Sequence, residues 1–418
     1  MINAKLRDRI TRVLYLVIFL TSLHYAFVAY INSSFLENFI AKENIGLLYV
    51  VASVISIIII SNLSKALKYL GQFRTYSIVL MVDILAMAGL ALTSSPLFPP
   101  TMQFQIGDSI ASIENPNPIM PWMPLIVIAC FLVFQITIIL NRVMIDIYME
   151  EFSKKEETGN ERGWLLTAMN LAFVFSPFIV GSIINDTSDG FWKIYAISSI
   201  FIILAHMVVV NKLRSVKDIE YHSPPILETF RKVSKNKDIF NIYISSFLLE
   251  FFYAWMVVYT PIYLNMAMGF NWSQIGIMFS IMLTAFVILE IPLGKIADKY
   301  LGEKEILTAG FIIAGLSTAA LSLIESRSLI VWTLVLFATR VGVSCIEVMN
   351  DTYFFKKVKA SDSDVISFFR NASPVAYIVA PALSSLILYF IDYKYLFAIL
   401  GAIMLTGIKF SLSIKDTL

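Results

Sequence analysis

The chain has 418 residues, of which 58% are hydrophobic and only 15% are charged, and its net charge is +2. A soluble domain carries about a quarter charged residues because its surface must be hydrated, so this composition excludes an ordinary soluble protein. The near-zero net charge excludes the strongly basic surface that binds nucleic acid. The two cysteines lie in apolar runs, and the sequence shows no phosphate-binding loop, metal-ligand motif or nucleophile elbow. We therefore expect neither an enzyme nor a protein that depends on a cofactor or a metal.

Twelve apolar segments are each long enough to cross a membrane, which requires about 20 mostly apolar residues in a helix. The first six lie at residues 13–32, 45–62, 75–93, 122–142, 164–184 and 191–211. The second six lie at residues 239–264, 273–293, 305–324, 328–350, 364–390 and 394–413. The length of the first segment is typical of a retained helix rather than a signal peptide. The sequence thus predicts an all-α integral membrane protein of about twelve transmembrane helices in a lipid bilayer.

Lysine and arginine residues indicate the orientation, because they collect on the cytoplasmic side of membrane proteins. Of the 32 such residues, 25 lie in segments on the side of the N-terminus, four lie on the opposite side and three lie within spans. We therefore expect a protein of the cell (inner or plasma) membrane with both termini in the cytoplasm. We expect it to be a monomer.

A basic segment at residues 212–238 divides the chain close to its midpoint. It contains seven lysine or arginine residues and the pair Pro224–Pro225. We interpret it as a cytoplasmic linker between a bundle at residues 1–211 and a second bundle at residues 239–418. Its charge favours a tether that rests on anionic lipid headgroups, and a docking site for a regulator is the alternative.

The two sets of six spans show an internal repeat. Four short segments recur in the same order, pairing residues 23–27 with 251–255, 45–48 with 275–278, 68–71 with 299–302, and 173–177 with 377–381. Two similar six-helix bundles that face each other can rock about a central site and expose it to each side of the membrane in turn. The repeat therefore favours a transporter over a channel or a membrane enzyme.

Glu250 lies near the middle of the seventh span, where an ionisable group costs free energy unless it has a partner or a function. Because burial disfavours the charged form of a carboxyl group, Glu250 is a candidate proton carrier or cation partner, with a static ion pair as the alternative. The same span carries several aromatic residues, among them Tyr253 and Trp255. An aromatic cavity with one acid suits amphipathic or cationic organic compounds, although aromatic residues also face lipid or pack between helices.

Four further residues with ionisable side chains lie inside predicted spans. Arg340 lies deep in the tenth span with Glu347 two turns later on the same face, so it is expected either to bind an anionic group or to form a static pair. Asp83 in the third span has two open interpretations, a role in coupling and membership of a static pair. His24 in the first span, beside Tyr25, is expected to be a hydrogen-bonded packing residue, with proton relay as the alternative.

Other charged residues are interpreted as structural. Arg142, Asp146 and Glu150 are spaced four residues apart at the inner end of the fourth span and can pair along one helix face. Arg370 and Glu290 are likewise expected to pair on the cytoplasmic side.

The stretch from Gly294 to Lys304 resembles the loop motif of the major facilitator superfamily. It has the glycine at Gly294, the acid and base at Asp298 and Lys299, a second glycine at Gly302 and a further base at Lys304. In that family the acid and the bases form salt bridges and helix-end contacts that hold the cytoplasmic side closed. The resemblance therefore implies that these five residues form a conformational gate without binding substrate.

Two features depart from the family's motif. Glu303 stands where a base is usual, and the first-half copy at residues 63–74 keeps Gly71 but has Leu67 in place of the acid. The better-preserved copy thus lies in the second half of the chain.

The resemblance implies the fold of that superfamily and secondary transport by alternating access. The leading hypothesis is proton-coupled export of small amphipathic organic compounds, similar to the drug-efflux branch. One alternative is a proton-coupled symporter for a sugar, a peptide or an organic anion, with Arg340 as the anchor. Another is a receptor or scaffold without transport, which the retained buried charges disfavour.

Residues 94–121 separate the third and fourth spans on the expected outer side and contain no lysine or arginine. Two interpretations stay open for this loop. It is either a cap over the outer mouth or a disordered insert.

Overall fold

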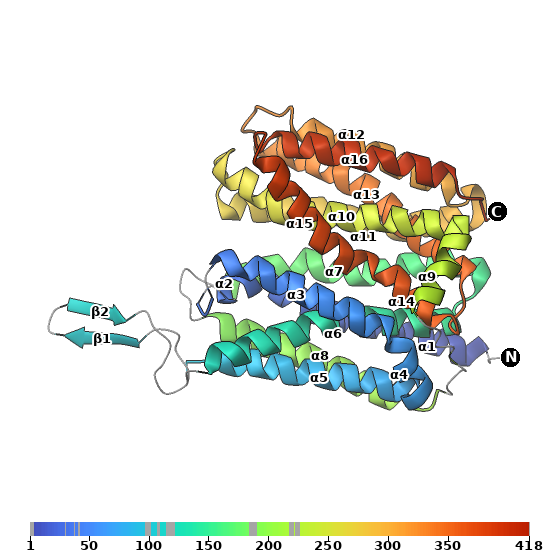
Figure 1. Cartoon of the computed structure of the whole chain (residues 1–418), viewed down its shortest axis with the longest axis horizontal. Coiled ribbons are helices and arrows are strands. Elements are labelled where there is room, and N and C mark those ends of the chain that lie inside the picture. The colour runs from blue at the N-terminus through green and yellow to red at the C-terminus, as the bar shows by residue number, and fades with distance from the viewer. Residues whose placement is uncertain are drawn as a thin grey trace.

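The computed structural model describes residues 4–29, 31–36, 38–40, 42–96, 102–106, 109–113, 122–183, 190–216, 221 and 226–417. Long helices run in a similar direction through the molecule, and both chain termini lie at one end of them (Figure 1). We call this end the termini side and the opposite end the hairpin side.

The N-terminal half begins with the long helix α1. Its helices are α1 (Ala4–Ala29), α2 (Asn32–Leu36), α3 (Lys42–Ser61), α4 (Leu63–Leu70), α5 (Gln72–Thr93), α6 (Met123–Phe152), α7 (Thr158–Ile183) and α8 (Phe191–Lys212), with the 3-10 turn η1 (Lys155–Glu157) before α7. The C-terminal half contains α9 (Ile226–Lys235), α10 (Lys237–Met266), α11 (Trp272–Ile296), α12 (Lys304–Leu321), α13 (Leu329–Lys357), α14 (Ser363–Arg370), α15 (Ala372–Leu388) and α16 (Tyr395–Leu412), with the π turn η3 (Ala297–Leu301) after α11.

The all-α membrane fold predicted from the sequence is confirmed. Within the described residues, 10 helices are long and apolar enough to span a membrane, or up to 11 when α3 and α4, bent by 46°, are taken as one span. The 26-residue helix α7 covers the position of the fifth predicted span.

Several predicted span boundaries are wrong. Helix α6 continues to Phe152 and helix α13 continues to Lys357, whereas the sequence predicted ends at 142 and 350. The predicted eleventh span corresponds to one candidate span, Ser363–Leu388, in which a turn at Asn371 separates α14 from α15. The added turns carry charged residues, among them the buried Asp146 and Asp351, so a search for apolar runs does not detect these turns.

Contacts between helices separate outer helices from inner ones. Helices α5 and α8 pack on other helices of their own half, as α12 and α16 do in the second half. Helix α7 packs against α11 and α13, and α3 packs against α15, so these helices form the interface between the halves (Figure 1).

Three glycines allow the closest approach at this interface. Gly159 and Gly163 lie one turn apart on α7, and Gly294 lies near the end of α11. A Cβ atom on Gly163 would lie 2.6 Å from the backbone oxygen of Glu290, and one on Gly294 would overlap the backbone oxygen of Gly159. Small residues let membrane helices approach backbone to backbone, so α7 and α11 are in direct contact on the termini side.

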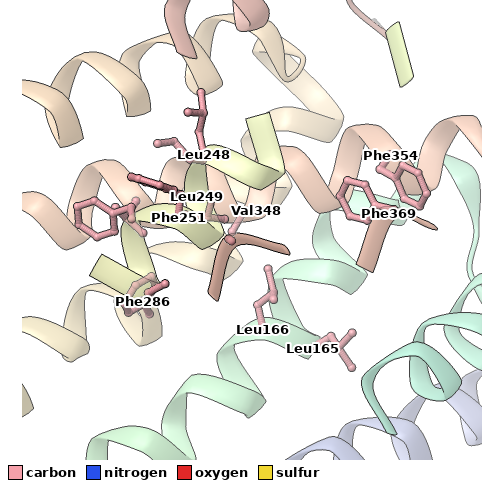
Figure 2. Close-up of a cluster of buried hydrophobic side chains, with 14 of the residues drawn as sticks. Leu165, Leu166, Leu248, Leu249, Phe251, Phe286, Val348, Phe354 and Phe369 are labelled. Carbon is pink, nitrogen blue, oxygen red and sulfur yellow. The ribbon is translucent and has the colours of Figure 1, made fainter. Parts of the chain in front are cut away.

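The hydrophobic core shows where the halves are joined. One buried cluster contains residues of both halves, and Figure 2 labels among its members Leu165 and Leu166 of α7, Leu248 of α10 and Val348 of α13. A second buried cluster contains residues of the N-terminal half alone, from Phe27 on α1 to Tyr195 on α8. Its members lie toward the hairpin side, so the described core is continuous between the halves only toward the termini side.

The described part of the loop at residues 94–121 is a two-stranded hairpin. Strands β1 (Met102–Ile106) and β2 (Ser109–Ile113) pair antiparallel, with Met102 opposite Ile113. Figure 1 draws them beyond the ends of the helices, so these strands do not cover the bundle. The remaining residues of the loop beyond Pro96 lie outside the described part of the chain.

The predicted linker at 212–238 contains the amphipathic helix α9, which packs on the C-terminal half. Thr229 donates a hydrogen bond of 2.9 Å to Asp364, and Lys232 pairs with Asp362 at 3.0 Å. The rings of Phe230 and Phe368 also meet, 6.1 Å apart between centroids. The tether therefore contacts protein, and its expected contact with lipid headgroups stays a prediction.

Candidate transport site and gate

Five charged side chains from both halves form a network near the termini side, which we call the ionic lock. Its members are Arg142 and Asp146 of α6, Arg162 of α7, Asp351 of α13 and Arg370 at the end of α14. Arg142 pairs with Asp351 at 3.1 Å, and Arg370 pairs with Asp146 at 2.6 Å, so both contacts join the two halves. Within single halves, Arg162 pairs with Asp146 at 2.6 Å and Arg370 with Asp351 at 2.9 Å.

Burial makes the ionic lock dependent on all its partners. Asp146 has no exposed surface, and the side chain of Asp351 is 4% exposed. The Arg162 guanidinium lies 3.3 Å above the centre of the Phe355 ring, which also joins the halves. Charges removed from water are stabilised only by close, well-directed partners. The predicted pair of Arg142 with Asp146 along α6 is present at 3.8 Å, and each of these two residues also pairs with a residue of the other half.

Asp298 makes the second contact between the halves, which we call the latch. Its carboxylate accepts hydrogen bonds from the backbone amides of Gly159 (3.0 Å) and Asn160 (2.8 Å) at the start of α7. The first amides of a helix lack partners within the helix and carry partial positive charge, so they attract a carboxylate. Lys356 of α13 lies 3.1 Å from the same carboxylate.

The bases of the latch differ from those that the motif implied. Lys299 is exposed on the π turn and Lys304 is half-buried at the start of α12, whereas the lysine that pairs with Asp298 is Lys356. Lys356 also pairs with the buried carboxylate of Glu303 at 2.7 Å. A base on α13 thus faces the acid that stands at the position of a usual base in the motif.

The glycines of the motif are required by close approach. Gly302 has a φ of +68°, and a Cβ atom there would overlap the carboxylate of Asp416. Near the end of the chain, Thr417 donates a hydrogen bond of 2.7 Å to Glu303. Gly294 allows the contact with Gly159 that brings Asp298 to the start of α7.

Three carboxyl groups lie on the inner helices, that of Glu290 buried and those of Glu250 and Glu347 half-buried, and each has a neutral hydrogen-bond donor. Glu250 of α10 accepts from Ser373 of α15 at 2.8 Å. Glu347 of α13 accepts from the hydroxyl of Tyr253 at 2.8 Å. A third carboxyl, on Glu290 of α11, accepts from Asn170 of α7 at 2.7 Å, and this bond joins the halves.

The remaining candidates on α10 and α13 pack closely. Arg340 is buried, and its guanidinium carbon lies 5.1 Å from the centre of the Phe252 ring. Its Nη1 donates a hydrogen bond of 3.4 Å to the hydroxyl of Thr339. Trp255 has no exposed surface and packs between Phe251 and Tyr259. Trp255 is therefore a packing residue in this conformation.

His24 and Asp83 pair inside the N-terminal half. The His24 Nε2 and Asp83 Oδ2 atoms lie 3.2 Å apart, and both side chains are 2% exposed. The Oγ atom of Ser198 on α8 lies within hydrogen-bond distance, 2.8 Å, of Nδ1 of the same histidine. The ring of Tyr25 packs edge-on against Phe173 of α7. His24 and Asp83 are thus partnered in this conformation, and the coupling roles considered for them stay predictions.

Sequence reasoning missed five residues with partners in these networks. They are Arg162, Asn170, Asp351, Lys356 and Ser373. Asp351 and Lys356 fall just beyond the predicted end of the tenth span at 350, and Arg162 was assigned to a loop. A longer predicted α13 would have placed Asp351 and Lys356 on a helix that faces the interface.

Comparison with known proteins identifies the family. A family model described as Major Facilitator Superfamily matches residues 118–363. No curated protein sequence matches the chain. The human organic anion transporter MFSD10 (TETRAN) has a similar structure, with a TM-score of 0.75 and 12% identity over 97% of this chain and 99% of that chain.

Two other solved structures share the fold. A bacterial homologue of the iron transporter ferroportin in an outward-facing state has a TM-score of 0.74 and 12% identity, over 96% of this chain and 98% of that chain. The proton:xylose symporter XylE has a TM-score of 0.71 and 15% identity, over 99% and 97%. At these identities the similarity shows the fold alone. Together with the family match, it shows that the chain is a multi-pass membrane transporter that belongs to the Major Facilitator Superfamily.

Proposed function

We propose that this protein is a secondary transporter that exports small amphipathic organic compounds in exchange for protons. The observation that carries the proposal is the set of charged side chains buried between two halves that meet on the termini side. Alternating access requires such a contact, strong enough to close one side and composed of separable pairs.

The ionic lock and the latch are proposed as the gate. Both join helices of different halves, and both lie on the side where the chain begins and ends. The excess of lysine and arginine on this side supports a cytoplasmic location. The structure then corresponds to a conformation closed toward the cytoplasm, and transport requires that these pairs separate.

Glu250, Glu347 and Tyr253 are proposed to form the substrate and proton site. Glu250 and Glu347 are hydrogen-bonded to neutral donors, and each lies within electrostatic reach of Arg142 in the ionic lock. A change in their protonation would therefore act on the gate directly. The aromatic residues of α10 supply the apolar surface that an amphipathic compound needs.

Arg340 favours a second candidate, proton-coupled uptake of an organic anion. It is a buried guanidinium on an inner helix, and guanidinium groups bind carboxylates in a bidentate manner. The fold similarity to a human organic anion transporter is compatible with this alternative.

Reconstitution in liposomes separates the candidates. A pH gradient is imposed, and internal pH is followed while ethidium, as an amphipathic cation, or benzoate, as an organic anion, is added. Export in exchange for protons predicts ethidium and proton movement in opposite directions. Movement of benzoate and protons together supports uptake, and no coupled movement with either compound contradicts both.

The residue assignment has its own test. Glu250→Gln is expected to uncouple ethidium movement from protons, because the amide cannot release a proton. Glu228→Gln, on the exposed face of α9, is the matched control and should behave as the unmodified protein. Proton coupling that survives in Glu250→Gln would remove this residue from the site.

A further inference from the structure

Glu290 has surroundings that differ from those of the other buried acids. It has no exposed surface, its Oε1 accepts one hydrogen bond from Asn170, and its Oε2 has no hydrogen-bond partner among the described atoms. No lysine or arginine of the described chain lies within ion-pair distance of it. A carboxylate buried in this way would hold an uncompensated charge, which is strongly unfavourable, whereas a carboxylic acid would not.

The facing surface of α7 fits a neutral carboxylic acid. Gly163, Thr167 and Asn170 recur at helical spacing, and Gly163 brings the two backbones together at Glu290 itself. The Thr167 hydroxyl is buried, faces the same carboxyl group and has no hydrogen-bond partner among the described atoms. A protonated Glu290 could accept from Asn170 through its carbonyl oxygen and donate its O–H to Thr167.

The charged neighbours do not replace a bound proton. Helix α13 presents Glu347, whose negative charge opposes a second one, and Glu347 itself accepts a hydrogen bond from Tyr253 of α10. Arg142 of α6 is within electrostatic reach but is already paired with two aspartates. On the remaining elements, Arg162 of α7 is paired with Asp146, and Asp298 of the π turn is held in the latch.

We propose that Glu290 binds a proton when the halves close on the termini side and releases it when they separate, so that closure is linked to proton uptake. Separation of α7 from α11 removes Asn170 and Thr167 and admits water, in which a carboxyl group ionises at neutral pH. By linkage, lowering the pH favours the closed conformation and raising it favours the open one. This inference rests on the proposed alternating access, but it adds a proton site that is distinct from Glu250.

The test measures conformation rather than transport. Spin labels are placed at Lys68→Cys on α4 and Glu305→Cys on α12, two exposed positions in different halves, in a protein with Cys130→Ser and Cys345→Ala. The distance between the labels is followed from pH 5 to pH 9 in lipid nanodiscs, with no substrate present. The labels are expected to move apart as pH rises.

Two substitutions decide the role of Glu290. Glu290→Gln is a neutral mimic of the acid of similar size, and it should stay closed across the range and lose the pH transition. Asn170→Asp adds a second acid against Glu290 and should move the transition by at least about one pH unit. Glu228→Gln is the control and should keep the original midpoint.

Contrary outcomes are distinguishable. A protein without a pH transition, or a Glu290→Gln variant with an unchanged midpoint, would overturn the inference. If the transition depends on Glu290 but no compound moves in liposomes, the proposed function fails and the proton-linked closure stands.

Discussion

Asp146 is a carboxylate without exposed surface, and three arginines from two halves of the chain surround it. The sequence predicted only its pairing with Arg142 one turn away, because i to i+4 neighbours can be read from spacing. Its stronger partners, Arg162 and Arg370, are set by the packing of α7 and α14, and no local pattern encodes that packing. The same limit applies to Asp298, whose helix-end contact is typical of the family motif but whose base, Lys356, comes from another helix.

Asp146→Asn removes one charge and leaves Arg162 and Arg370 without their shared partner. Breaking a buried pair from one side costs about 3–5 kcal/mol, so the thermal unfolding temperature in detergent should fall by several degrees. Asp8→Asn on the exposed start of α1, where the neighbouring Arg7 lies at 3.9 Å, should have little effect. Equal unfolding temperatures of the two variants would show that the ionic pairs of Asp146 do not stabilise the fold.

Two lysines give a matched comparison at the latch. Lys356→Met should leave Asp298 and Glu303 as buried acids without a base, and the termini side should open more often. Lys299→Met, on the exposed π turn, should change nothing. The distance between spin labels at positions 68 and 305 measures this opening. A larger increase in Lys299→Met than in Lys356→Met would show that the base of the motif, and not Lys356, holds the gate closed.

At the scale of elements, Gly159, Gly163 and Gly294 allow α7 and α11 to pack backbone to backbone. The order and type of the long helices could be predicted, because apolar runs of about 20 residues are a strong signal. Their ends could not, because the last turns of α6 and α13 place charged residues against protein rather than in water. The turn at Asn371 was also missed, since apolar residues on both sides of it were taken as one continuous helix.

Gly294→Ala tests the contact of α7 with α11. The added Cβ atom meets the backbone of Gly159, so the helices must separate and the closed conformation should become less populated. Gly276→Ala on the same helix is the control, because a Cβ atom there meets nothing within 4 Å. The same label distance reports the result, and an unchanged distribution in Gly294→Ala would contradict a close-packed gate.

At the scale of the whole molecule, the two halves share a core toward the termini side and keep separate cores elsewhere among the described residues. The internal repeat predicted two bundles, and the family match and the fold agree with that arrangement.

A disulfide across the halves tests the central claim of alternating access. The side chains of Ser61 and Asn371 lie 3.2 Å apart at the termini side, one in each half. In a protein with Cys130→Ser and Cys345→Ala, the double variant Ser61→Cys with Asn371→Cys should form a disulfide on oxidation. Each single-cysteine variant serves as the control for oxidation itself.

Transport of ethidium or benzoate by this variant in liposomes, whichever the unmodified protein moves, is measured before and after oxidation and again after reduction. The account predicts that transport stops when the disulfide holds the termini side closed and returns when the disulfide is reduced. Undiminished transport with the disulfide formed would contradict it.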